Sequence, residues 1–256
     1  IIPSATKIER PHIPGTGYCT FVVQDENDTK YMFKFNDFDM LFKNIQFNRT
    51  LNQHGISVPK LEQHVYKSSW METYQMIPGR TLYECVKDGM PDTSVKKIYR
   101  AIVDDFIKMS EIDLHTLTKT MYSNIHQVVQ YDVAENTSKI VAPLFAGATR
   151  IMNRGEKSDM GLYHCGITPK NIIVSPDGEY AGLIDMDDVA ISNKNYAFGV
   201  MATQYERLGH NPQELIDAYE GISGEGLNHK HLERIGKINN FGRWVMWKAG
   251  LHQNQK

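Results

Sequence analysis

Long apolar runs are missing from this sequence of 256 residues, and no stretch approaches the ~20 residues that a membrane-spanning helix needs. Cysteine is also scarce, because Cys19, Cys85 and Cys165 are too few and too scattered for a disulfide framework or a zinc site. No secretory signal pattern is visible. These absences predict no membrane span and favour a reducing, cytoplasmic setting. The chain starts at Ile1 and not at a methionine, so the sequence leaves open what precedes it, export included.

An excess of either charge is missing too. The sequence has 28 Lys and Arg against 30 Asp and Glu, which gives a net charge of −2. The basic surplus that nucleic-acid binding requires is therefore absent, and no run of like charges forms a tail. A hydrophobic content of 41% and a charged content of 23% are ordinary for a globular protein. The length fits one large domain or two modest ones.

The first third of the sequence has the pattern of strands. The segments "TGYCTFVV" and "KYMFKFN" are rich in aromatic and β-branched residues, and the "DEND" between them suits a hairpin turn. Residues 38–54 then have helical character. The segment "SWMETYQMI" predicts another strand, which Pro78 and Gly79 end. We therefore predict a β-rich N-terminal lobe over residues 1–78, with the boundary to the next lobe at Pro78-Gly79.

The rest of the chain, residues 79–256, has mainly helical patterns. Apolar residues recur at intervals of three and four over residues 94–110 and again over 140–155, and each stripe predicts a helix packed on the core. One hairpin interrupts the helices, because strands at 172–174 and 180–184 flank a Pro-Asp-Gly turn. A β-rich front and a helical back predict a two-lobed α+β protein.

The hairpin carries polar residues at its open end. Asn171 comes just before its first strand and Asp185 just after its second, and these two ends of an antiparallel hairpin lie side by side. Carboxylate and amide oxygens are hard ligands that suit Mg²⁺, which also shares phosphate oxygens. Asp187 and Asp188 add negative charge that a cation would balance. We predict a magnesium site at Asn171 and Asp185. The alternative is a solvated acidic turn with a structural asparagine.

The segment "HCGITPKNIIV…GLIDMDD", residues 164–188, resembles the pattern H-x-D-x-x-x-x-N followed by I-D-x-x-D. That pair is typical of the aminoglycoside phosphotransferase and choline kinase-like family, whose fold is similar to that of eukaryotic protein kinases. The segment "WMETYQMIPGRTL" resembles the hinge between lobes of that family, and "IPGTGY" stands where the family has its phosphate-covering loop. The resemblance spans about residues 13–200 and implies a two-lobed protein kinase-like fold.

The resemblance implies a nucleotide site on the N-terminal lobe. Lys34 would contact the α- and β-phosphates of ATP or GTP, as the β3 lysine does in kinases. Backbone groups around Glu72 to Tyr74 would contact the adenine or guanine ring of the nucleotide. Gly15 and Gly17 would belong to the loop over the phosphates, although two glycines near a hairpin are by themselves a weak signal.

The resemblance also assigns roles around the hairpin, and one of them has no side chain to perform it. Asn171 and Asp185 would hold Mg²⁺ against the β- and γ-phosphates, which makes Asp185 a catalytic residue as well as a metal ligand. His164 would be a structural residue of the loop and not a base. Gly166 stands where the family has the acid that orients and deprotonates the acceptor hydroxyl.

Two further positions depart from the pattern of the family. The helix expected to pair with Lys34 has no Glu between residues 40 and 61, and carries neutral amides such as Asn44 instead. An amide could hydrogen-bond the lysine but would not balance its charge. Beyond the hairpin the family usually has a second motif with acidic residues, and this chain has Asn193 and Ala197 at those positions.

The absence of a base at residue 166 should affect turnover far more than binding of the nucleotide. A general base typically contributes ~10²–10⁴-fold to a rate, whereas positioning and electrostatic support carry most of phosphoryl transfer. Turnover should therefore slow severely while binding of the magnesium nucleotide persists. Three explanations stay open: a natural pseudokinase, a variant of an Asp-containing parent, or replacement by another acid, of which Asp187 and Asp188 are nearest in sequence. Cys165 has no activating His–Asp arrangement and is predicted to be a buried spacer.

We predict a phosphotransferase that moves the γ-phosphate of ATP or GTP to a hydroxyl of a small molecule, such as an amino sugar, a sugar or a choline-like alcohol. Its activity in this chain is expected to be impaired by Gly166. The acceptor is expected between the hairpin and the helices after Asn195. The alternative is a non-catalytic nucleotide-binding module that acts through a partner. A protein kinase is disfavoured, because the sequence has no Ala-Pro-Glu, no Asp-Phe-Gly and no room for an activation loop after Asp185.

Overall fold

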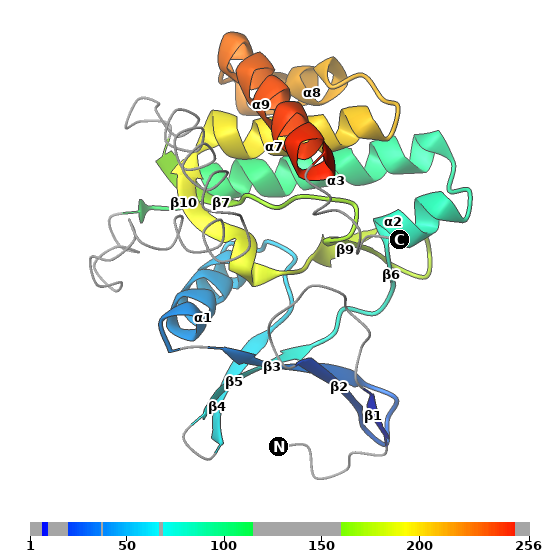
Figure 1. Ribbon diagram of the computed structural model, residues 1–256, viewed down its shortest axis with the longest axis vertical. Coiled ribbons are helices and arrows are strands. Elements are labelled where there is room, and N and C mark those ends of the chain that lie inside the picture. The colour runs from blue at the N-terminus through cyan, green and yellow to red at the C-terminus, as the bar shows by residue number, and fades with distance from the viewer. Residues whose placement is uncertain (1–6, 10–19, 37, 67–68, 115–159, 249–256) are drawn as a thin grey trace.

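The computed structural model describes five stretches of the chain: residues 7–9, 20–36, 38–66, 69–114 and 160–248. Figure 1 draws the other residues as a thin grey trace. The helix predicted over 140–155 lies outside the described stretches, as do Gly15 and Gly17 of the predicted phosphate loop. Among the helices of the described stretches, none is long and apolar enough to cross a bilayer.

A five-stranded antiparallel sheet forms the N-terminal part of the molecule, in the order β1-β2-β3-β5-β4 (Figure 1). Its strands are β1 (Lys7–Glu9), β2 (Thr20–Gln24), β3 (Lys30–Asn36), β4 (Leu61–Tyr66) and β5 (Ser69–Gln75). The alternation of "KYMFKFN" decides the two faces of β3. Phe33 packs with Val23 and Met71 in a small apolar cluster, whereas Met32 packs against the main core. One face of the sheet is therefore turned toward the rest of the molecule.

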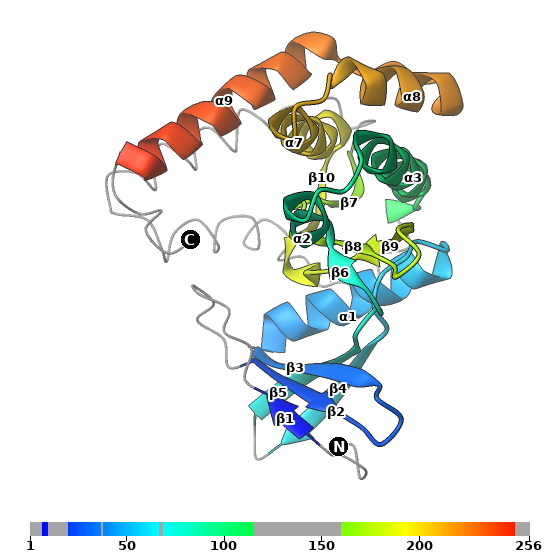
Figure 2. The ribbon, with the colours of Figure 1, turned by 90° about the vertical axis from the view of Figure 1, so that its right-hand side faces the viewer.

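Helix α1 (Phe38–Gln53) lies between this sheet and the helical part of the molecule (Figure 2). Its bounds agree with the predicted helix to within one residue. Gly55 follows the helix with a φ of 69°, in the left-handed region that favours glycine and ends helices. Phe47 and Leu51 of α1 are buried in the main core, so the helix joins the two parts of the fold.

The second part is mainly helical, as predicted. Its helices are α2 (Leu82–Lys87), α3 (Asp92–Ser110), α7 (Lys194–Arg207), α8 (Gln213–Ser223) and α9 (His229–Lys248). The stripe predicted over 94–110 is the buried face of α3. Phe106 of this face stacks on Tyr163, with ring centroids 4.6 Å apart, and meets Phe198 and Tyr219 edge-on. This aromatic cluster fixes α3 against α7, α8 and the strand that leads into the candidate site.

Two small antiparallel sheets lie between α1 and the helices (Figure 2). Their strands are β6 (Arg80–Thr81), β7 (Met160–His164), β8 (Ile172–Val174), β9 (Tyr180–Leu183) and β10 (Val189–Asn193). The pair β8–β9 is the predicted hairpin, with β6 added at its edge. The pair β7–β10 was not predicted from the sequence. Because its register pairs Val189 with His164, the residues just after β7 face those just before β10.

Candidate active site

The β8–β9 hairpin brings Asn171 and Asp185 together at its open end. The N–H of Ile184 donates to the carbonyl of Asn171 at 2.9 Å, which extends the hairpin to the residue before Asp185. Asp185 is exposed and has a φ of 70°, in the left-handed region that residues other than glycine seldom adopt. Such conformations cluster at functional sites. The adjacency expected of these two residues is observed, and the binding of a metal there stays a prediction.

The donor atoms at this end of the hairpin suit a magnesium ion that is shared with phosphate. The amide nitrogen of Asn171 donates to the carbonyl of Gly166 at 2.9 Å, so the amide oxygen is the atom that would coordinate. The carboxylate of Asp185 supplies the second ligand. Within the described stretches, no three Asp, Glu, His or Cys side chains converge on one point. A Mg²⁺ ion would complete its shell with water and phosphate oxygens, as it usually does in nucleotide sites.

Lys34 reaches from β3 to the short turn η2 (Met186–Asp188), where it pairs with the carboxylate of Asp187. Both side chains are largely buried, with 13% and 15% of their surfaces exposed. Burial disfavours both charges, but their mutual attraction outweighs it, so the pKa of Lys34 is raised and that of Asp187 is lowered. Asn44 of α1 donates to the same carboxylate at 2.7 Å. The negative charge that pairs with Lys34 therefore comes from Asp187 of η2, and not from a glutamate on α1.

Glu72 and Tyr74 belong to the same buried network. Glu72 is fully buried on β5, directly opposite Lys34 in the register of β3 and β5. Its carboxylate accepts hydrogen bonds from Asn44, at 2.9 Å, and from the hydroxyl of Tyr74. Burial and the charge of Glu72 raise the pKa of Tyr74 well above its ordinary value. The main chain of this segment pairs with β3 on one side and β4 on the other, and its contact with a nucleotide base stays a prediction.

His164 holds the loop that follows β7. It is fully buried, its Nδ1 accepts from the N–H of Gly166 at 3.2 Å, and its Nε2 donates to the carbonyl of Ile184 at 2.7 Å. Burial lowers the pKa of His164 to about 4, so the ring is neutral at pH 7. Burial also raises the pKa of the neighbouring Cys165 to about 12, which makes a thiolate nucleophile unfavourable. Both residues therefore serve the structure of the loop.

Gly166 lies against the side chain of Asp188. The N–H of Cys165 donates to the carbonyl of Asp188 at 2.9 Å, which extends the β7–β10 pairing by one residue. A Cβ atom added to Gly166 would overlap the Asp188 carboxylate, with Cγ at 2.5 Å and Cβ at 2.8 Å. The φ of Gly166 is not in the left-handed region, so lack of space, and not backbone conformation, requires glycine here. The carboxylate of Asp188 occupies the volume that a side chain at residue 166 would fill.

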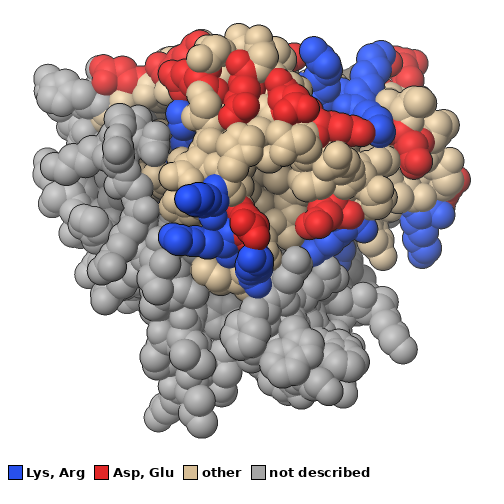
Figure 3. All heavy atoms as spheres, turned by 90° about the horizontal axis from the view of Figure 1, so that it is seen from above, with Lys and Arg blue, Asp and Glu red and all other residues tan. Residues whose placement is uncertain are grey.

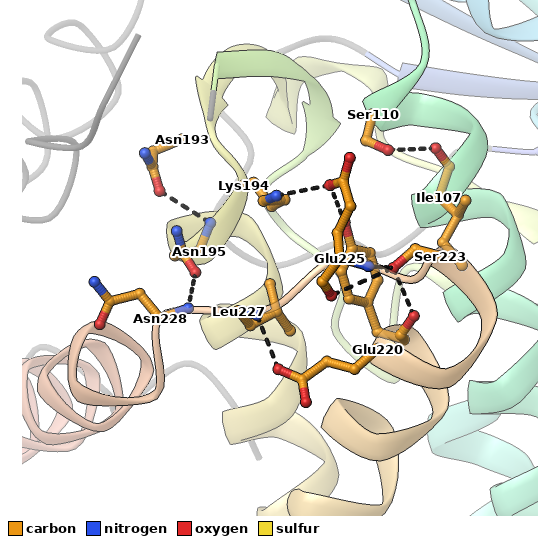
Figure 4. Close-up of polar contacts among 11 residues, drawn as sticks. Ile107, Ser110, Asn193, Lys194, Asn195, Glu220, Ser223, Glu225, Leu227 and Asn228 are labelled. Atoms are coloured by element: carbon orange, nitrogen blue, oxygen red, sulfur yellow. Dashed lines mark hydrogen bonds and ion pairs between the residues drawn. The ribbon is translucent and has the colours of Figure 1, made fainter. Parts of the chain in front are cut away.

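Asn193 and Ala197, which stand where the second family motif has acids, have structural roles in this chain. Asn193 is buried and caps α7, because its side-chain oxygen accepts from the N–H of Asn195 at 2.9 Å (Figure 4). The side chain of Asn195 in turn accepts from the N–H of Asn228, at 2.8 Å, in the connection between α8 and α9. Ala197 is fully buried in the core. These residues join α7 to the last two helices.

Acidic side chains on α8, α9 and their connection have local partners. Glu225 pairs with Lys194 at 2.9 Å (Figure 4), and Glu214 pairs with Lys96 at 2.8 Å. Figure 3, which views the molecule from the side of these helices, shows basic side chains interspersed with the acidic ones. Among the described residues this face therefore carries both signs of charge.

No model of a known protein family matches the sequence, and no curated protein matches it as a relative. Solved structures do match over most of the chain. An aminoglycoside-3'-phosphotransferase of type VIII superposes with a TM-score of 0.65 at 15% identity, covering 93% of this chain and 94% of that one. An amicoumacin kinase in complex with AMP-PNP, Ca²⁺ and Ami gives 0.67 at 13% identity, with coverages of 94% and 81%. An ethanolamine kinase from Plasmodium vivax gives 0.59 at 14% identity, with coverages of 97% and 78%.

These likenesses show the fold of the chain. It is the two-lobed protein kinase-like α+β fold that the structures of these small-molecule phosphotransferases share, which confirms the fold predicted from the motif pair. At such low identities a shared fold does not by itself carry over an activity, which must be argued from the site.

Proposed function

We propose that this protein is a phosphotransferase of the aminoglycoside phosphotransferase and choline kinase-like family, which moves the γ-phosphoryl group of ATP or GTP to a hydroxyl of a small molecule. The observation that carries the proposal is the convergence of Asn171, Asp185 and Lys34 around the turn η2. Oxygen ligands for a cation beside a buried lysine are the groups that phosphoryl transfer needs, because catalysis there is mainly positioning and electrostatic support. The likeness to phosphotransferases solved with AMP-PNP or GDP supports it.

Within this proposal each group has one task. Asn171 and Asp185 hold Mg²⁺, which when bound neutralises charge on the β- and γ-phosphates. Lys34 contacts the α- and β-phosphates and exchanges its partner Asp187 for them. The segment from Glu72 to Tyr74 lies beside the adenine or guanine ring of the nucleotide.

The proposed division of the chain follows the predicted one. Residues 1–78 bind the nucleotide, about 72–80 form the hinge, and 79–256 hold the acceptor between the hairpin and the helices after Asn195. The acceptor is a small alcohol of the amino sugar, sugar or choline-like kind, since the solved neighbours are named for aminoglycosides, a macrolide and ethanolamine. A cytoplasmic setting fits the nucleotide co-substrate. Gly166 also favours a second candidate, a nucleotide-binding module without catalysis that acts through a partner.

Binding of the magnesium nucleotide tests the proposal. Mg²⁺ with ATP or GTP should raise the melting temperature, since a ligand at a hundred times its Kd contributes about 2.7 kcal/mol. For a chain of this size that amounts to roughly 5–10 °C. The variant Asp185→Ala should lose the rise. Asp177→Ala, at the turn end of the same hairpin, is the matched control and should keep it.

The outcomes separate the two candidates. Absence of a shift with either nucleotide would remove both of them. A shift without release of nucleoside diphosphate in any mixture of acceptors would favour the non-catalytic module.

A further inference from the structure

We propose that Asp188 is the carboxylate that receives the proton of the acceptor hydroxyl in this protein, in place of the side chain that Gly166 lacks. The inference rests on the proposed phosphotransferase function and identifies the residue that acts on the acceptor at the same site. The sequence motif locates the base at residue 166 and includes Asp188 only as the last acid of I-D-x-x-D, so the choice of Asp188 rests on the structure.

The position of the carboxylate is the main support. The Asp188 side chain fills the space beside the Gly166 backbone, so a Cβ there would be only 2.5 Å from its Cγ. One amide also connects the two residues: the side-chain nitrogen of Asn171 donates to the carbonyl of Gly166 at 2.9 Å and lies 3.4 Å from Oδ2 of Asp188. The carboxylate therefore lies beside the loop and the predicted metal ligand, where a side chain from residue 166 would have been.

The β7–β10 pairing makes this position a fixed one. Val189 pairs with His164, and the N–H of Cys165 donates to the carbonyl of Asp188, so the backbone of Asp188 continues a two-stranded sheet. Met186, at the start of the same turn, is buried in the core. A catalytic group on such a rigid element is held more accurately than one on a long loop.

The two neighbouring acids are less suited to this task. Asp187 is 15% exposed and already pairs with Lys34 and Asn44 on the side of the sheet. Asp185 stands at the open end of the hairpin as the predicted metal ligand. Asp188 is half-buried and is the acid of this cluster that lies against the loop after β7.

The proposed step balances without another reagent. The acceptor oxygen forms a bond to the γ-phosphorus, and the bond between that phosphorus and the oxygen bridging to the β-phosphate breaks. The nucleoside diphosphate leaves with the electron pair of that bond, and the hydroxyl proton passes to the Asp188 carboxylate. In this protein Gly166 leaves the space that the Asp188 carboxylate fills, because a larger residue at 166 would displace that carboxylate.

Release of inorganic phosphate from ATP or GTP with Mg²⁺, with water as the acceptor, is the assay. Asp188→Asn keeps the volume of the side chain and removes its basicity, so it should lower the rate ~10²–10⁴-fold. The exchange variant Gly166→Asp/Asp188→Gly moves the carboxylate back to the loop, and it should be at least about tenfold faster than Asp188→Gly alone. Asp177→Asn is the matched control for loss of one carboxylate on the hairpin.

Three outcomes decide the inference. It is overturned if Asp188→Asn keeps the rate within about threefold of the unchanged protein, a loss far smaller than a missing base produces. It is equally overturned if the unchanged protein shows the nucleotide-induced rise in melting temperature but releases no phosphate. If that rise is absent, the proposed function itself fails. Because Asp188→Asn changes no volume, its result stands even if the exchange variant does not fold.

Discussion

At two places around the candidate site the family resemblance predicts an acidic side chain, and this chain has none there. Both places lie against the turn η2. Beside Lys34, α1 carries the neutral Asn44, and after β7 the loop carries Gly166. At the first place Asp187 supplies the charge, and at the second Asp188 fills the space. The comparison teaches that one short turn, fixed next to two elements that carry no acid, can supply a carboxylate to both places.

The two acids of the turn differ in their surroundings. Asp187 is enclosed by Lys34 and Asn44, and the amine of Lys43 donates to its backbone carbonyl at 2.8 Å. Asp188 lies at the edge of the loop beside Asn171. Loss of the Asp187 carboxylate should therefore reduce mainly the free energy of unfolding, whereas loss of the Asp188 carboxylate should reduce mainly turnover.

The largest effect on stability is expected for Asp187→Ala. This change removes the carboxylate that pairs with the largely buried Lys34, and breaking one side of a buried pair costs about 3 kcal/mol or more. Urea unfolding measures the loss, and Asp188→Asn provides the comparison, with an expected loss below about 1 kcal/mol. Equal losses for the two variants would contradict the distinction drawn between the two acids.

A pH-dependent effect is expected from His164, which holds the loop on the Gly166 side. Its pKa in the folded protein is about 4, below the ordinary value of 6.5, so folding favours the neutral ring. The resulting stability is fully present above pH 6.5 and is lost as the pH falls toward 4, by about 3 kcal/mol. His164→Gln should therefore lose less unfolding free energy than the unchanged protein between pH 7 and 4. Parallel pH profiles would show that this histidine does not hold the loop.

A moderate effect is expected for Asn44→Ala on the other side of the comparison. The amide donates to both Glu72 and Asp187, and its removal leaves two carboxylates with fewer donors, at a cost of about 1–3 kcal/mol. Asn52→Ala, on the same helix, is the matched control, because Asn52 donates only within α1 in the described structure. Chemical denaturation of both variants decides the point. Similar losses would mean that the amide of Asn44 is not needed to hold the two acids.

The smallest effect is expected for Lys97→Ala. Lys97 pairs with Glu179 at 2.6 Å, but the two side chains are 68% and 53% exposed. Exposed pairs contribute about 0–1 kcal/mol, so the melting temperature should hardly change. This variant isolates burial as the cause of the large effect at Asp187. A loss as large as that of Asp187→Ala would remove burial as the explanation.

Much of the framework could be predicted from the sequence because its signals are local. The alternation of "KYMFKFN", the stripe of α3 and the Pro-Asp-Gly turn are each contained within one segment, and the structure has an element at each. The adjacency of Asn171 and Asp185 followed from the geometry of the hairpin.

The rest depended on pairings between distant segments. The strands "MGLYH" and "VAISN" are short, no turn joins them directly, and only their pairing brings Asp188 to Gly166. The contact of Lys34 with Asp187 spans 153 residues. The sequence could therefore name Asp187 and Asp188 as nearby acids but could not assign a different place to each.

The most direct test of the central claim is the coupling free energy between residues 166 and 188. In the unchanged protein, Gly166→Ala should cost about 1–3 kcal/mol of unfolding free energy, because its Cβ meets Asp188. In the Asp188→Gly background the same change should cost little or even stabilise, since the φ of residue 166 suits alanine. The difference between the two backgrounds should thus exceed about 1 kcal/mol. Effects that add to within about 0.5 kcal/mol would contradict the claim that Asp188 occupies the place of the missing side chain.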